Sequence, residues 1–326
     1  MAGVTTREEK TYAHKFLKEH EDALGLIGQA FQAKGVDWGV DFNVEPSWDI
    51  PFPRIAYYLS LARLLRTQAL ILALDGDAAG SVRSLQTGLF LGDTLRLSHT
   101  LIAEMIDTAI VRMMSSTVCA VLPQLEVKGH AGEELLPYLR SDRLENGFYT
   151  SMQWELFGYT RSFESIGWLD FANNCKTDGF YFGFGGNEAA NYLMGLMYRP
   201  FLLFDMASSY EYKIQLMKVI ETNSGDWDKG YQAYKRNGWL LGLYALPRFD
   251  QMGEKVREAL TICNQARIEV EIHMFHRKYK RFPATAEELE KWCLDNWNPL
   301  SGVQDPLPKV ETTAAFVPGA KSPAGN

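Results

Sequence analysis

The chain has little cysteine, and its cysteines lack the spacing that marks a metal or redox centre. Four cysteines occur in 326 residues, separated by 56, 88 and 30 positions, with no C-x-x-C pair. This spacing argues against zinc-binding and dithiol redox proteins. Isolated cysteines usually serve as small buried hydrophobic residues, and a chain of this length needs no disulfides, so their pairing stays open. They are Cys119, Cys175, Cys263 and Cys293.

An excess of positive charge is also absent. The chain has 40 acidic and 33 basic residues, giving a net charge of -7. Nucleic-acid-binding proteins normally carry a basic patch or stripe. A short basic cluster at residues 277–281 lies near a predicted helix end, where it interacts favourably with the helix dipole. We therefore expect no nucleic-acid partner.

Long uncharged apolar runs are missing as well. The first twenty residues are polar, which predicts no secretory signal peptide. The most apolar stretch, residues 55–74, carries Arg63 and Arg66 near its middle, and both would be costly in hydrocarbon. We expect no transmembrane segment in the chain and membrane association only through a partner or a removed anchor. The compartment stays open between the cytoplasm and the periplasmic side of a bacterial envelope.

Motifs that carry chemistry are missing too. No serine or cysteine stands in a G-x-S-x-G nucleophile elbow. Gly183, Gly185 and Gly186 form a glycine-rich stretch, but no Gly-Lys-Ser/Thr follows it to make a phosphate loop. The sequence predicts no catalytic residue and no cofactor.

What the sequence does contain is helical periodicity. Hydrophobic residues make up 46% of the chain and aromatic residues 13%, which predicts a folded core. The clearest signal lies at residues 55–92, where one apolar stripe ends at Gly76 and a second begins after Asp77. Glycine suits a left-handed C-cap and aspartate suits an N-cap, so two antiparallel helices are expected. The predicted fold class is all-α, an antiparallel helical array.

This helix pair resembles a tetratricopeptide unit. With Gly76 at the turn, Ala69, Ser81 and Gly88 occupy the small-residue positions, and Leu65 occupies one of the large packing positions. Small residues let the two helices approach closely. The resemblance implies a TPR-like pair within a solenoid-like stack of helices.

Further helices are predicted over residues 7–35, 95–122, 133–144 and about 250–280, with Pro123 ending the second of them. The alternating residue pattern over 178–186 is also compatible with a short strand, so a strand there is an alternative. The expected organisation is a helical array over 1–247, a long helix with a short capped helix over 248–306, and a tail over 307–326 that is disordered or bound to a partner. Thr285 and Glu288 form the capping box of the short helix.

A second resemblance covers residues 267–306. A long helix is followed by Phe282-Pro283, then by Thr285-Ala-Glu-Glu-Leu289, then by Asp305-Pro306. This order resembles the C-terminal module of a group of uncharacterised helical proteins from planctomycetes and related bacteria, and a similar pattern occurs in major pseudopilins of type II secretion. Many members of that group begin with a membrane anchor and carry a TPR-like helix pair. The resemblance implies packing motifs and no chemistry.

Two sets of residues are candidates for a site. Glu269, His273 and His276 fall at offsets 0, 4 and 7 of one helix, so they share a face that offers a carboxylate and two imidazoles to a metal. The alternative is an ordinary polar face. The second set is an aromatic cluster, either core or a partner-binding surface, since tryptophan and tyrosine are enriched at interface hot spots. Its candidate residues are Trp154, Phe157, Trp168, Phe180, Tyr181, Phe182 and Phe184.

These patterns favour a non-enzymatic protein-binding or scaffold protein whose partners are other protein chains. A structural subunit of a larger membrane-associated or envelope assembly is an alternative. A metal-binding protein or enzyme that uses the Glu269, His273 and His276 face is a second alternative.

Overall fold

The computed structural model describes residues 7–33, 54–96, 98–129, 132–165, 188–197, 214 and 249–296. This part of the chain is mostly helical and contains no strand, which confirms the all-α prediction. The strand considered over 178–186 and the predicted tail at 307–326 lie outside the described residues. The named elements are α1 (Arg7–Glu19), α2 (Glu21–Ala33), α3 (Tyr57–Asp75), α4 (Ala78–Arg96), α5 (Leu101–Val127), the 3₁₀ helix η2 (Glu133–Leu135), α6 (Ser141–Ser165), α11 (Phe249–Tyr279) and α12 (Ala286–Asn296).

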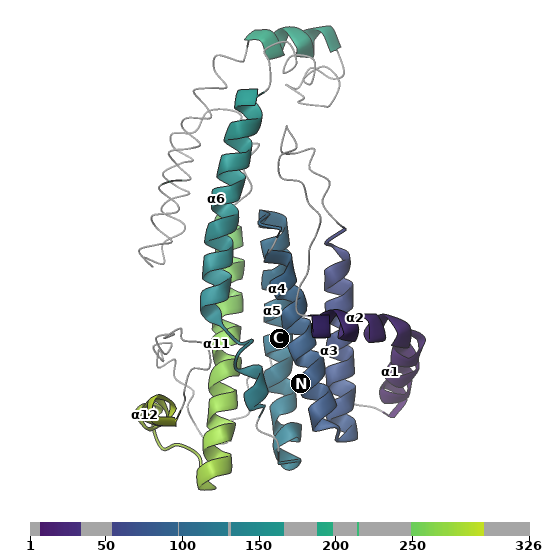
Figure 1. The fold of residues 1–326 in the computed structure, drawn as a ribbon, viewed down its shortest axis with the longest axis vertical. Coiled ribbons are helices and arrows are strands. Elements are labelled where there is room, and N and C mark those ends of the chain that lie inside the picture. The colour runs from purple at the N-terminus through teal and green to yellow at the C-terminus, as the bar shows by residue number, and fades with distance from the viewer. Residues whose placement is uncertain are drawn as a thin grey trace.

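The bundle is built around α5. Helices α3, α4, α6 and α11 all pack against it, and all five run roughly along the long axis of the molecule (Figure 1). A single cluster of buried side chains joins α3, α4, α5, α6 and α11. The domain boundary predicted near residue 248 stays a prediction, and α11, which follows it, packs directly along α5.

The turn between α3 and α4 forms as predicted. Gly76 has a φ of 85° and its N–H donates to the carbonyl of Ala73, so it ends α3 in the left-handed conformation. Asp77 caps α4 by accepting a hydrogen bond from the N–H of Gly80 at 2.9 Å. The two helices approach closely, because the buried Ser81 hydroxyl donates to the Ala69 carbonyl at 2.8 Å.

Asp77→Ala is expected to lower the free energy of unfolding by about 1 kcal/mol, because the first turn of α4 loses its side-chain acceptor. Urea unfolding followed by circular dichroism measures this change. Asp77→Asn keeps an acceptor at the same position and is expected to retain most of the stability. Equal losses in the two variants would show that the carboxylate charge matters and the cap does not.

Three predicted helices differ in the structure. The helix predicted over 7–35 is two helices, because the His20 ring bonds the Phe16 carbonyl at 2.9 Å while the His20 N–H bonds the carbonyl of Leu17. Pro123 does not end α5 but lies inside it. The helix continues to Val127 because Val121, Leu122 and Leu125 on either side of Pro123 are buried in the core, and this packing outweighs the missing N–H.

The third difference concerns the helix predicted over 133–144. Only η2 and the start of α6 form there.

The capping box of α12 is confirmed, since the N–H of Glu288 donates to Thr285 Oγ1 at 3.2 Å. Glu288 in turn accepts from the N–H of Ala284 at 2.6 Å, one residue earlier than in the usual box.

Candidate functional site

The three residues of the predicted metal face, Glu269, His273 and His276, have different partners in the structure. His273 Nδ1 lies 2.8 Å from Glu126 Oε2, and His276 Nδ1 contacts the other oxygen of the same carboxylate. Glu269 instead accepts a hydrogen bond from Gln265 at 2.9 Å. In the part of the chain that the structure describes, no group of three or more His, Cys, Asp or Glu side chains is arranged to hold a metal. The two histidines therefore join α11 to the end of α5.

Only one residue of the predicted aromatic surface has a described side chain. Trp154 on α6 is half-buried and stacks on His99, with ring centroids 5.7 Å apart and an angle of 10° between the planes. Phe157 lies within α6, but its side chain is outside the described set. Trp168, Phe180, Tyr181, Phe182 and Phe184 also lie outside the described residues. The aromatic surface stays a prediction.

Sequence reasoning missed a buried charge cluster where α4, α5 and α6 meet. Arg96 Nε lies 2.7 Å from Asp107 Oδ2 and 4.0 Å from Glu104 Oε2, and both carboxyl groups have fully buried side chains. Arg143 of α6 pairs with Asp93 of α4 beside them. Both oxygens of Glu104 and Oδ1 of Asp107 have no hydrogen-bond partner among the described residues.

Burial raises the pKa values of the three carboxyl groups in this cluster. Desolvation raises the pKa of Glu104 to about 8, with Asp107 adding to the increase and Arg96 opposing it. The same cause raises the pKa of Asp93 to about 6, where Arg143 is the main opposing charge. The pKa of Asp107 is also raised by burial, against the charge of Arg96. Glu104 and Asp107 have no exposed side-chain surface, so their charges act on the stability of the bundle.

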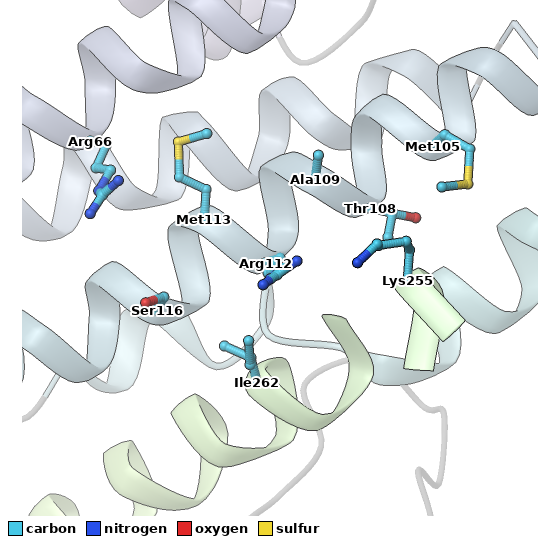
Figure 2. Close-up of a pocket in the computed structure, with 9 residues that line it drawn as sticks. All are labelled: Arg66, Met105, Thr108, Ala109, Arg112, Met113, Ser116, Lys255 and Ile262. Atoms are coloured by element: carbon cyan, nitrogen blue, oxygen red, sulfur yellow. The ribbon is translucent and has the colours of Figure 1, made fainter. Parts of the chain in front are cut away.

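Another face of α5 is hollowed. A cavity of about 410 Å³ lies over α5, between α3 on one side and α11 on the other (Figure 2). We call it the α5 groove. Its volume falls within the range of binding pockets in proteins. It is lined by Arg66 of α3, by Met105, Thr108, Ala109, Arg112, Met113 and Ser116 of α5, and by Lys255 and Ile262 of α11.

The α5 groove is apolar along its floor and positive around it. Methionine, alanine and isoleucine side chains supply the apolar surface, and three cations project from three different helices. The carboxylate of Glu258 pairs with two of them, lying 2.8 Å from Arg112 and 3.3 Å from Lys255. These groups are about half exposed, so the lining keeps a net positive charge in contact with solvent.

Two buried polar atoms lie among the residues of the groove without a partner. Arg66 Nε and Thr108 Oγ1 have no hydrogen-bond partner within the described part of the chain. Thr108 is only 2% exposed. Buried donors of this kind are costly unless something accepts from them. Both atoms lie beneath the surface of the groove, so they add to the cost of this packing and offer nothing to a ligand on the surface.

The sequence contained part of this signal. Met105, Ala109 and Met113 share a face of α5, and this apolar stripe alone is typical of a core helix. In the structure all three are only partly buried, because α3 and α11 flank this face without closing over it. Arg112 and Ser116, which fall on the same face at offsets 7 and 11 from Met105, were the residues that marked it as exposed.

Comparison of the chain with protein-family models, with curated proteins and with solved structures finds no match. The resemblances to TPR-like proteins and to the planctomycete group thus remain predictions from the sequence.

Helix α5 has one further property. Among the described helices it is the one whose length and mean hydropathy would allow it to cross a membrane. Just over half of its most apolar stretch, 56%, is buried inside the bundle. A core helix passes the same test of length and composition, so the expectation that the chain has no transmembrane segment stays a prediction.

Proposed function

We propose that this protein is a non-enzymatic binding protein, a helical scaffold that holds another protein chain in the α5 groove. The observation that supports the proposal is the open groove itself, an apolar floor on the central helix between two flanking helices with three cations along it. Protein-binding grooves between helices commonly combine an apolar floor with charged edges.

The position of the groove suits a scaffold. Its floor belongs to α5, which is held by α3, α4, α6 and α11, so the surface is fixed before a partner arrives. A binding surface that is already ordered avoids part of the entropy cost of association. Positive charge at the edges also speeds encounter with a negatively charged partner.

The test is the mass of the particle in an extract of cells that naturally produce the chain. Size-exclusion chromatography with light scattering, followed by mass spectrometry, is expected to show a complex heavier than the 36.9 kDa chain with a second protein in defined ratio. Lys255→Glu reverses a charge of the groove and is expected to weaken this complex at least about tenfold, equivalent to ~1.4 kcal/mol.

Arg257→Glu is the matched control. It makes the same charge change on α11 two residues later, which is about 200° around the helix and away from the groove. The control is expected to keep the complex. Elution of the unmodified chain alone at its own mass would contradict the proposed function, and equal losses in the two variants would place the binding surface elsewhere.

A further inference from the structure

The α5 groove also indicates what kind of segment it binds. We infer that its occupant is a single amphipathic helix of a partner protein that carries acidic residues beside its apolar face. This inference rests on the proposed function and adds the chemistry of the partner to it. It is carried by the length of the groove, by the register of its floor and by the placement of its charges.

The groove has the length of a short helix. Its floor runs along α5 from Met105 to Ser116, twelve residues, which corresponds to about 16 Å or three helical turns. Ile102 lies three residues before Met105 on the same face of α5 and is 66% exposed, so an exposed apolar side chain follows the groove at this end. The two walls are helices as well, since Arg66 belongs to α3, and Lys255 and Ile262 belong to α11.

The register of the floor matches helix packing. Ile102, Met105, Ala109 and Met113 fall at offsets 0, 3, 7 and 11, which is the spacing of a ridge on one face of α5. Ala109 at the centre leaves room for a larger side chain between the two methionines. A partner helix with apolar residues three and four positions apart can pack along this ridge.

The charges are spread along the groove. Arg66 stands at one end, Lys255 stands at the other, and Arg112 lies between them (Figure 2). Arg112 and Lys255 share Oε2 of Glu258, and Arg66 lies apart from them on α3. The groove therefore keeps an excess of positive charge at more than one place along its length. This placement suits carboxylates that recur along the side of a helix.

Arg66 lines the groove from α3 and is partly exposed. A guanidinium donates hydrogen bonds to carboxylate oxygens. Glu258 pairs with Arg112 and Lys255, whereas Arg66 on the opposite wall has no ion pair among the described residues.

The test is site-specific photocrosslinking in cells that naturally produce the full chain. Ser116→p-benzoylphenylalanine places the reactive ketone on an exposed position of the groove, and Arg257→p-benzoylphenylalanine is the control on the other side of α11. The expected adduct forms from position 116 and not from position 257. Mass spectrometry is expected to map it to a partner segment with apolar residues at helical spacing and flanking Asp or Glu.

The mapped segment is then synthesised and titrated against the full chain by fluorescence anisotropy. Lys255→Glu is expected to weaken binding at least about tenfold, and a Glu→Lys change in the peptide is expected to restore most of it. Arg257→Glu is expected to leave the dissociation constant unchanged. Binding is expected to weaken with salt, because the charges lie near solvent.

The outcomes separate this inference from the proposed function. A mapped segment that is basic or not helical overturns the inference and leaves a protein-binding scaffold in place. An adduct with a molecule of a few hundred daltons, an adduct only within this chain, or no adduct above that of the position 257 control overturns both.

Discussion

Glu104→Gln is expected to stabilise the protein at pH 9 and to leave its stability almost unchanged at pH 5. Glu104 is 1% exposed, and burial raises its pKa to about 8. The folded protein must therefore either hold a proton on this carboxyl or bury a charge whose oxygens have no hydrogen-bond partner among the described residues. Glutamine has nearly the same shape and carries no charge, so it removes this cost at high pH.

The pH window follows from linkage. The folded pKa of Glu104 is about 8, above the ordinary value of 4.5. Because the folded state binds the proton more tightly, stability falls as pH rises from the unfolded value through the folded value. Wild-type protein is thus expected to lose on the order of a few kcal/mol between pH 5 and pH 9 from this group. The raised pKa values of Asp93 and Asp107 act in the same direction.

Chemical unfolding at pH 5, 7 and 9 measures the effect. The matched control is Glu258→Gln, which makes the same change at a carboxylate that is about half exposed and paired with Arg112. Exposed ion pairs contribute little, so the control is expected to change stability by less than about 1 kcal/mol at each pH. A pH profile for Glu104→Gln that stays parallel to that of wild type would contradict the raised pKa.

The sequence predicted local features well because each depends on a few neighbouring residues. The αL cap at Gly76, the N-cap at Asp77 and the capping box at Thr285 and Glu288 all form. The Thr100 cap of α5, which accepts from the N–H of Ala103 at 3.3 Å, was missed because the predicted helix ran through it. The all-α class follows from the same periodicity, summed over many turns.

The buried charge cluster and the α5 groove both depend on which face of α5 packs against which helix. The sequence does not determine this packing. Helix α5 is apolar around most of its circumference, so its stripe does not select one buried side. Glu104 and Asp107 are ionisable residues, yet α4 and α6 cover them. Met105 and Met113 belong to the apolar stripe of the helix, yet they line a groove. Only the packing of distant segments decides between these arrangements.

The packing of α4 against α5 leaves no room for a side chain at Gly92. This residue lies in α4, where a Cβ would stand 2.1 Å from Oδ1 of Asp107 and 3.5 Å from Cγ2 of Ile110. Asp107 is fully buried and its other oxygen is held by Arg96 at 2.7 Å, so its short side chain has little room to move. Gly88 shows the same feature one turn earlier, with a Cβ 2.6 Å from Met114 Sδ.

Gly92→Ala is therefore expected to lower the free energy of unfolding by about 3 kcal/mol, through overpacking and displacement of the Arg96–Asp107 pair. In an unobstructed helix the same substitution stabilises by up to ~1 kcal/mol. Gly25→Ala in α2 is the matched control, because nothing lies within 4 Å of its Cβ, and it is expected to stabilise the protein. Thermal unfolding of the two variants should give shifts of opposite sign. A melting temperature for Gly92→Ala at or above that of wild type would contradict the close packing of α4 on the buried carboxylates.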